Sequence, residues 1–337
     1  MIRRLVEILQ PVCDSLEVDT SGNVYAVKRG PRDGPTLMIA AHTDEIGLVV
    51  KSVESNGFVR FEKVGGVLDN LLAARLVRVK GRLGVIGMKP GHYQSPEERS
   101  RVNPHTEMYV DLGATSSGQI ADWGIEIGDQ IAFVAPLVEF GDSSTLVAGK
   151  AVDNRLGCAL LAKLIAETEP PAGTLIAAFT SQEEVGLKGA GVAAFRQRPT
   201  LGLALDTMPS GDTPEMNEHT QLNTKLGGGP CFQVLAGPGG RGFLLPPAVK
   251  SFLVDTARQA KIPYQLVTFT GGNNDAATIA WAAEGIPAGS ICLARRYSHS
   301  PLEVADMRDA DGTYRLLQAI TSRMSDFPAF GFLDGAA

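Results

Sequence analysis

A change of pattern in the middle of the chain constrains its fold most strongly. After Gly149, apolar runs such as 174–181 (TLIAAFTS) and 288–294 (AGSICLA) alternate with helix-like segments such as 154–168 (NRLGCALLAKLIAET). This alternation predicts a sheet with helices on both faces. From about 68 to 146 the chain instead has short β-like runs, frequent glycines and almost no helical period. That stretch predicts a small all-β unit such as a barrel.

The first part of the chain matches the α/β pattern of the last part. Residues 36–41 (TLMIAA) form a continuous apolar run, which is typical of a central strand covered on both faces. Residues 1–19 predict an amphipathic first helix. We therefore predict one discontinuous α/β domain, residues 1–67 and 148–337, interrupted by a β-barrel insertion at residues 68–147.

The composition limits the cellular compartment and the kinds of partner that we expect. The 337 residues carry a net charge of -6 with no long run of like charges, which argues against nucleic acid as a partner. The four cysteines lie far apart and form no CxxC pair, so we expect a reducing, cytoplasmic location. No segment approaches eighteen uninterrupted apolar residues, and we expect neither a membrane span nor a membrane partner.

Acids and histidines follow the apolar strands at the points where these strands end. In open α/β sheets, ligands bind beyond the carboxyl ends of the strands, so residues far apart in the sequence can meet there. Together with an aspartate in the segment GKAVDNR, the set contains two histidines and six carboxylates: His42, Asp44, Asp153, Glu183, Glu184, Asp206, Asp275 and His299.

So many carboxylates cannot stay ionised together in a partly buried cleft unless cations offset their repulsion. Imidazole and carboxylate ligands without cysteine favour zinc, cobalt or manganese over a structural thiolate site. The set exceeds what one ion needs, and two ions sharing a bridging carboxylate would use most of it. We therefore predict a two-metal site.

The spacing of His42 and Asp44 suggests how this pair works. Side chains two residues apart in an extended chain point to the same side, so Asp44 either binds the same centre or holds the imidazole. Glu45 is expected to point away. Taken alone, the pair is equally consistent with a core histidine followed by a turn acid.

The adjacent acids Glu183 and Glu184 suggest two different roles for neighbouring carboxylates. One carboxylate could bind a metal while its neighbour moves protons for a metal-activated water. The alternative is that both acids open a helix, where the dipole favours them. Asp153 could likewise be a helix N-cap, Asp206 a turn acid, and His299 a loop histidine. His92, His105 and His219 lie in polar surroundings and are expected at the surface.

Five segments in order resemble a known family. They are 41–48 (AHTDEIGL), 149–155 (GKAVDNR), 180–190 (TSQEEVGLKGA), 203–206 (LALD) and 296–301 (RYSHSP). They are similar to the signature segments of the dinuclear metallo-aminopeptidases that include the tetrahedral, deblocking and glutamyl aminopeptidases, some of which are labelled endoglucanases. The resemblance spans about residues 15–325 and implies a phosphorylase/hydrolase-like metallopeptidase fold with an inserted barrel.

The resemblance also implies roles for individual residues. His42, Asp153 and Asp206 would bind one metal, and Asp153, Glu184 and His299 the other, with zinc or cobalt as the ions. Glu183 would be the general base and acid, and Asp44 would orient His42. Such an enzyme releases N-terminal amino acids from peptides through attack by a metal-bridging hydroxide. Through the insertion, family members assemble into dimers and tetrahedral dodecamers, so a homo-oligomer is implied here.

The sequence departs from the family pattern at two places. Asn273 and Asn274 precede Asp275 where the family pattern is closer to Gly-Gly-Thr, which puts the role of this loop in doubt. Asn154 stands where the family often has a second acid. Neither departure removes an implied ligand. With only Trp123 and Trp281 as tryptophans, no sugar-stacking platform is evident.

Two alternative functions stay open at this point. A carboxypeptidase or amide deacylase could use the same metals, and would need a cationic anchor such as Arg155, Arg295 or Arg296. A non-catalytic protein could keep a structural metal site, although such a site has no need of an unliganded acid like Glu183. The preferred N-terminal residue does not follow from the sequence.

Overall fold

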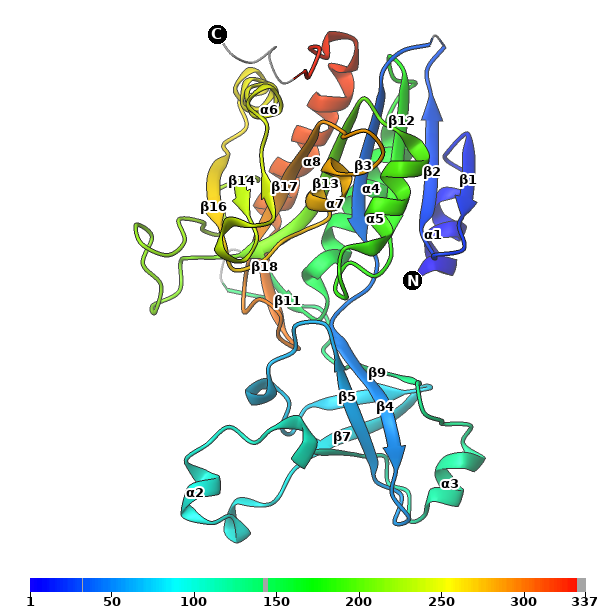
Figure 1. The fold of residues 1–337 in the computed structure, drawn as a ribbon, viewed down its shortest axis with the longest axis vertical. Coiled ribbons are helices and arrows are strands. Elements are labelled where there is room, and N and C mark those ends of the chain that lie inside the picture. Colours follow the sequence, from blue (N-terminus) through cyan, green and yellow to red (C-terminus); the bar gives the residue numbers. More distant parts are fainter. Residues whose placement is uncertain (32, 142–144, 332–337) are drawn as a thin grey trace.

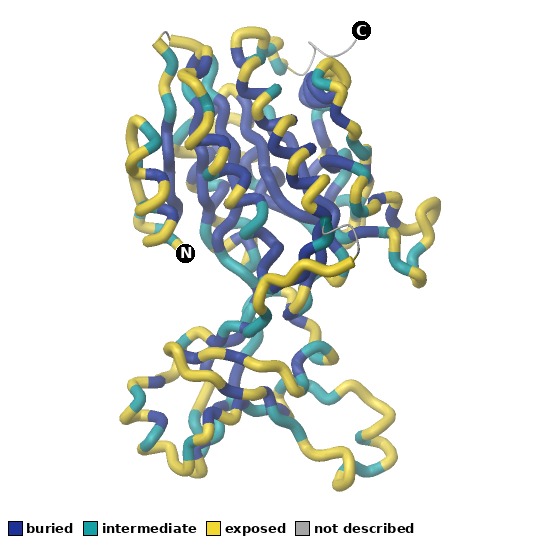
Figure 2. Tube along the Cα trace, turned by 180° about the vertical axis from the view of Figure 1, so that it is seen from behind, coloured by how far each residue is buried: buried dark blue, intermediate teal, exposed yellow. Residues whose placement is uncertain are grey.

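The computed structural model describes residues 1–31, 33–141 and 145–331. It has two parts, an α/β domain and a smaller barrel, which are joined at a narrow waist (Figure 1). Each part has its own apolar core. Figure 2 shows the buried residues concentrated in the strands of the α/β domain, with a second, smaller group inside the barrel.

Among the described residues, twelve strands form the sheet of the α/β domain. Its central neighbours β12, β3, β13 and β17 run parallel, as expected from their continuous apolar runs. The order along the sheet is β1 (Ser15–Val18), β2 (Val24–Arg29), β12 (Thr174–Thr180), β3 (Thr36–His42), β13 (Leu201–Pro209), β17 (Ala288–Arg296), β18 (Glu303–Asp306), β11 (Leu146–Gly149) and β10 (Val138–Phe140). Three further strands branch off at β17, namely β14 (Cys231–Ala236), β15 (Phe243–Leu244) and β16 (Gln265–Phe269).

Helices cover both faces of this sheet, which confirms the predicted α/β class (Figure 1). On one face α4 (Val152–Glu167) packs beside α1 (Ile2–Leu9) and α8 (Met307–Ser322), and on the other α5 (Lys188–Gln197) packs beside α7 (Ala276–Ala280). Helix α6 (Pro247–Gln259) packs against β14, β17 and α8. No helix among the described residues combines the length and apolar character that crossing a membrane requires.

The smaller part is a closed antiparallel barrel, as the sequence predicted. Its strands follow the order β4 (Gly47–Val53), β5 (Val59–Val64), β8 (Tyr109–Asp111), β7 (Arg82–Gly87), β6 (Leu76–Val79) and β9 (Gln130–Phe133). Two short helices, α2 (Pro96–Arg99) and α3 (Ser117–Asp122), lie in its connections. Short 3₁₀ helices occur at Asp69–Leu71, Gly91–Tyr93, His105–Glu107, Pro238–Gly240 and Met324–Asp326.

The predicted boundaries of the barrel, 68 and 147, are wrong. Strands β4 and β5 belong to the barrel, while β10 and β11 pair at the edge of the large sheet, so the barrel strands span 47–133. The alternating pattern of 47–64 indicates strands with one buried face, but it does not indicate which sheet they join. Residues 332–337 of the predicted α/β domain lie outside the described part.

The predicted first helix also needs correction. The first helix ends at Leu9, and residues Ser15–Val18 form an edge strand instead of continuing the helix. Pro11 cannot donate a backbone hydrogen bond, which favours an end of the helix before it.

Candidate metal centre

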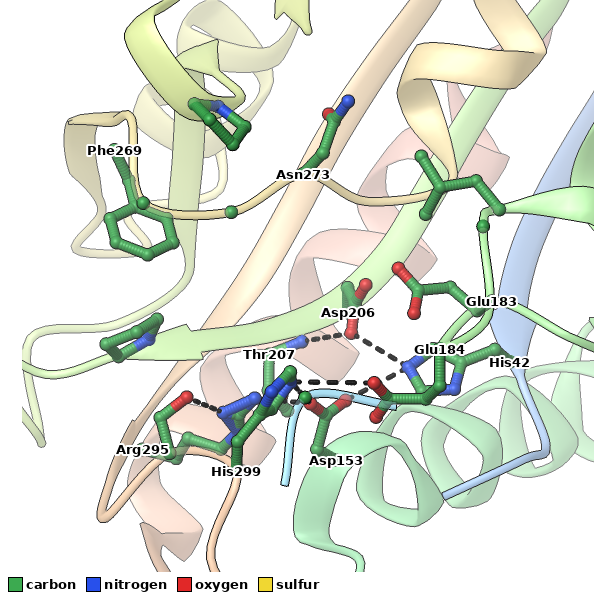
Figure 3. Close-up of a pocket in the computed structure, with 18 of the residues that line it drawn as sticks. His42, Asp153, Glu183, Glu184, Asp206, Thr207, Phe269, Asn273, Arg295 and His299 are labelled. Carbon is green, nitrogen blue, oxygen red and sulfur yellow. Dashed lines mark hydrogen bonds and ion pairs between the residues drawn. The ribbon is translucent and has the colours of Figure 1, made fainter. Parts of the chain in front are cut away.

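The parallel register brings the ends of the central strands to one edge of the sheet. Thr180, the last residue of β12, lies opposite His42, the last residue of β3. Asp206 lies in the adjacent strand β13, and His299 follows three residues after the end of β17. Figure 3 shows the side chains of His42, Asp206 and His299 directed toward one another, together with the acids that follow β12 and the aspartate near the start of α4.

Three of the predicted ligands form a buried group. His42 Nε2 lies 3.0 Å from Asp153 Oδ1 and 3.4 Å from Asp206 Oδ1. All three residues are at least 90% buried, and their ligand atoms lie within 4.8 Å of one another. This distance suits a single divalent cation between an imidazole and two carboxylates.

A second group uses the other oxygen of the same aspartate. His299 Nε2 lies 3.5 Å from Asp153 Oδ2 and 3.6 Å from Glu184 Oε2. The ligand atoms again lie within 4.8 Å of one another. Asp153 therefore belongs to both groups, with one oxygen turned toward each. Glu183 and Glu184 also form a ligand-sized group with His42.

Burial gives several of these acids unusual acidities. It raises the pKa of Glu183 to about 10 and that of Glu184 to about 7, and nearby carboxylates add to both shifts. Burial also disfavours ionisation of Asp153, but the Arg295 guanidinium and the two imidazoles outweigh it and hold the pKa of that carboxyl well below its usual range. An uncompensated cluster of this kind is stabilised by added cations.

The residues present fit divalent metal ions. Glu184 Oε1 is buried and has no hydrogen-bond partner among the described residues, so it is an acceptor that an ion would satisfy. The donors are imidazole nitrogens and carboxylate oxygens, which suit zinc, cobalt and manganese. Cys158 lies nearby, but its thiol donates to the backbone oxygen of His42 (3.0 Å), and burial raises its pKa to about 12.

Asp44 supports the site through a different contact from the one expected. Its carboxylate accepts hydrogen bonds from the backbone N–H groups of Glu183 (3.2 Å) and Glu184 (3.1 Å). His42 Nδ1 lies closer to the backbone oxygen of Asp44 (3.1 Å) than to its carboxylate (3.7 Å). The side chain thus orients the two glutamates, and the main chain orients the imidazole. Glu45 pairs with Lys150 (2.6 Å).

Asp275 does not join the other acids in the cavity. It is buried behind them, where its Oδ2 accepts a hydrogen bond from Thr180 Oγ1 (2.7 Å). Asn273 lines the cavity instead. Asn274 is buried and donates to Gln233 Oε1 and Ser290 Oγ, both at 2.7 Å. The expected convergence of six carboxylates at the cleft is therefore wrong for this one.

The local structure also shows how the remaining acids relate to the ends of helices. Glu183 and Glu184 lie in a turn before α5, which begins only at Lys188, so they do not open that helix. Asp153 directs its two oxygens to His42, Arg295 and His299, and its side chain does not cap α4.

The remaining histidines lie away from the site. His92 and His219 are exposed as expected. The prediction was wrong for His105, which is half-buried in the barrel, where Glu62 and Asp69 pair with it.

Two features near the metal groups were missed by the sequence analysis. Glu303 is 2% exposed and accepts hydrogen bonds from the backbone N–H groups of Asp153 (3.0 Å) and His299 (3.1 Å). Gly66, after β5, packs so closely that a Cβ atom there would lie 2.5 Å from His299 Nδ1. Glu303 has no sequence signal beyond its position four residues after His299.

A cavity of about 550 Å³ opens over the two groups. Leu68, Leu187, Pro209, Pro238 and Phe269 give it an apolar wall, and the acids and histidines form its floor. This volume lies within the range of small-molecule sites.

Comparison with known proteins gives consistent matches along the chain. The family described as M42 glutamyl aminopeptidase matches residues 22–316. Lysyl aminopeptidase of Pyrococcus furiosus is 30% identical over 95% of this chain and 90% of its own length.

Two solved structures extend this comparison to the fold. The aminopeptidase APDkam598 of Desulfurococcus kamchatkensis has a TM-score of 0.90 at 35% identity, covering 97% of this chain and 91% of that chain. The TET1 peptidase of Pyrococcus horikoshii, described as able to assemble into a tetrahedron or a large octahedral shell, has a TM-score of 0.81 at 27% identity, covering 95% and 92%.

Proposed function

Because the chain belongs to the M42 glutamyl aminopeptidase family, we propose that it is a two-metal aminopeptidase that releases N-terminal residues from peptides. One observation carries the proposal. Two ligand-sized groups share Asp153, one with His42 and Asp206 and the other with Glu184 and His299. Glu183 lies beside both groups and lines the same cavity.

The proposed chemistry divides between the ions and the protein. When bound by the two groups, divalent ions would supply Lewis-acid activation of a water molecule and of the peptide carbonyl. Glu183 is held at its backbone by Asp44, and bound cations beside it would stabilise its ionised form. It is then placed to accept a proton from the attacking water and to pass it to the leaving amine. Its carboxylate accepts no hydrogen bond from the described residues, so it is free for this exchange. We propose zinc or cobalt as the ions, both of which suit imidazole and carboxylate donors.

A carboxypeptidase or deacylase function has less support. It needs a free cation in the cavity to bind a substrate carboxylate. Arg155 lies 3.4 Å from Glu45, Arg296 lies 2.8 Å from Asp212, and Arg295 pairs with Asp153 and Glu303. Each of the three candidate anchors is therefore already paired with an acid, which favours recognition of a free amine by the acidic floor.

The experiment compares free-amine and N-acetylated aminoacyl amides as substrates, with and without chelator. The panel includes Glu, Lys and Leu derivatives. The family description names a glutamyl and the Pyrococcus furiosus relative a lysyl aminopeptidase, and Leu is added because the cavity wall is apolar. We expect hydrolysis of free-amine substrates only, and loss of activity with chelator. Preferential hydrolysis of the acetylated forms would instead support the deacylase.

The role of Glu183 is tested in the same assay with Glu183→Gln. Removal of a general base should lower kcat by roughly 10²- to 10⁴-fold, while the content of bound metal and the melting temperature stay close to those of the wild type. Glu45→Gln is the matched control. It makes the same chemical change close to the site in sequence, next to Asp44, but at a glutamate that pairs with Lys150. Activity that survives Glu183→Gln would reject the assigned role.

We further propose that the chain forms a homo-oligomer through the barrel. Leu76 of β6 and Val85 of β7 lie opposite each other and are exposed, and Leu83 on the same pair of strands is 51% exposed. Apolar residues that face outward from a barrel favour contact with another surface. The ability of the Pyrococcus horikoshii relative to form closed shells supports this proposal.

A further inference from the structure

Arg295 places a positive charge inside the ligand set. It is only 3% exposed, and one of its terminal nitrogens donates to Asp153 Oδ2. Figure 3 shows its guanidinium beside Asp153 and His299. Asp153 Oδ2 is the same oxygen that lies 3.5 Å from His299 Nε2. The arginine therefore binds the ligand atom that belongs to the second group, whereas Asp153 Oδ1 faces His42 and the first group.

The guanidinium is held firmly in this position. Arg295 Nη1 donates to Ser298 Oγ (2.7 Å), and Arg295 Nε lies 3.3 Å from Glu303 Oε1. Glu303 in turn accepts hydrogen bonds from the backbone N–H groups of Asp153 and His299. If Arg295 moved away, Glu303 would be left as a buried carboxylate without its cation, which is unfavourable.

This arrangement makes the two groups electrostatically unequal. A divalent ion between Asp153, Glu184 and His299 meets the repulsion of a fixed guanidinium in a water-poor site, where charges interact strongly. It must also share Asp153 Oδ2 with the N–H group that Arg295 donates to that oxygen. An ion in the first group would be held by the opposite oxygen of Asp153, which faces His42, and would avoid this competition.

We propose that Arg295 makes the two metal sites unequal in affinity, so that the His42 group fills first and the His299 group fills only at a higher concentration of free metal. Activity that needs both ions then depends on the supply of metal. This inference rests on the proposed two-metal function. Arg295 acts here as a positioning and charge-setting residue, since it contacts the ligand Asp153 and not the substrate.

The test is a titration of metal-free protein with Co²⁺, followed by equilibrium dialysis with elemental analysis and by isothermal titration calorimetry. For the wild type we expect one tight ion and a second that binds more weakly. In Arg295→Met the second affinity should rise by roughly 10- to 100-fold, because the substitution removes a positive charge from a water-poor site where charges interact strongly, while the first changes little.

Two further variants keep the test decisive. Arg295→Met combined with Glu303→Gln removes the carboxylate that would otherwise lose its cation, so a folding defect in the single variant does not hide the result. Arg296→Met is the matched control, because this adjacent arginine pairs with Asp212 at the surface. Circular dichroism and melting temperatures verify that each variant folds.

The outcomes separate this inference from the proposed function. The inference would be overturned if the wild type bound both ions with equal affinity, or if the second affinity were unchanged in both Arg295 variants. The proposed function would still stand if chelator-sensitive hydrolysis of free-amine substrates were observed. A wild type that binds no divalent ion and hydrolyses no substrate of the panel would overturn both. A selective gain at the second site in the Arg295 variants supports the inference whatever their activity.

Discussion

Asp153 is the residue on which the candidate site depends most. Its Oδ1 faces His42 at 3.0 Å, and its Oδ2 faces Arg295 and His299. Its backbone N–H is held by Glu303. A carboxylate fixed at both its backbone and its oxygens cannot rotate freely, so it presents a defined oxygen to each group of ligands.

The acidity of Glu184 predicts how metal uptake depends on pH. Burial raises its pKa from the ordinary value of 4.5 to about 7, so in metal-free protein at pH 6 this carboxyl is mostly protonated. Binding of an ion must release that proton, and the apparent affinity for Co²⁺ should therefore fall as the pH drops below about 7. Calorimetry in two buffers of different ionisation enthalpy measures the released protons. Uptake without proton release at pH 6 would refute the prediction.

Gly66 predicts a steric effect on His299. A Cβ at this position would lie 2.5 Å from Nδ1 of the imidazole, so Gly66→Ala should displace His299 and weaken the second ion by roughly 10- to 100-fold, with little change in the first. Metal titration measures both affinities. Gly91→Ala is the control, because a Cβ there meets no atom within 4 Å. If Gly66→Ala and Gly91→Ala had the same metal affinities, the predicted displacement of His299 would be rejected.

Among the elements of secondary structure, the turn between β12 and α5 is held by the end of β3. Thr43 N–H donates to Thr180 O (2.8 Å), and the Asp44 carboxylate accepts from the N–H groups of Glu183 and Glu184. The turn also includes Gln182 at a φ of 59°, an unfavourable conformation for a residue with a side chain. The conformation of this turn is thus maintained by contacts from the neighbouring strand.

Replacement of Asp44 tests this support. Asp44→Ala leaves two backbone N–H groups without their acceptor, so we expect a loss of roughly 10- to 100-fold in kcat/KM or in metal affinity, with the global fold retained. Asp44→Asn keeps one acceptor oxygen and should lose less. Steady-state kinetics and metal analysis of the two variants provide the comparison. An alanine variant with the activity of the wild type would exclude a supporting role for this side chain.

Across the whole molecule, the barrel and the site occupy different parts of the chain. The barrel extends away from the α/β domain through a narrow waist (Figure 1), and the segment around Gly66 and Leu68 reaches the metal groups. Barrel strands β6 and β7 lie far along the chain from every proposed ligand. We therefore expect that mutations in these strands can alter assembly without altering the chemistry.

Charged residues on the outer face of the barrel should disrupt assembly. In Leu76→Asp/Val85→Asp, two opposed exposed apolar side chains become carboxylates, which cannot be buried in an interface without a large desolvation cost. Light scattering after gel filtration should show a smaller species, with hydrolysis of small amide substrates retained. Leu244→Asp, at a 69% exposed leucine of the α/β domain, is the control. A monomeric wild type would contradict the prediction.

Much of the fold and most of the candidate site could be predicted from single segments. Continuous apolar runs such as 36–41 indicate buried central strands without any knowledge of their neighbours, and parallel strands place their carboxyl ends at one edge. That is why His42, Glu183, Asp206 and His299 could be expected to meet, and the structure brings them together.

The features that depend on pairing across the chain could not be predicted in this way. The pattern of 47–64 reports one buried face, and three-dimensional pairing alone assigned these strands to the barrel. Asp275 follows a strand as the other acids do, yet its neighbours bury it behind the cavity. Glu303 and Arg295 act through contacts with Asp153, which lies 150 and 142 residues earlier in the chain. The local sequence determines which segments can form buried strands and where polar residues follow them. Long-range packing determines which charged side chains contact one another.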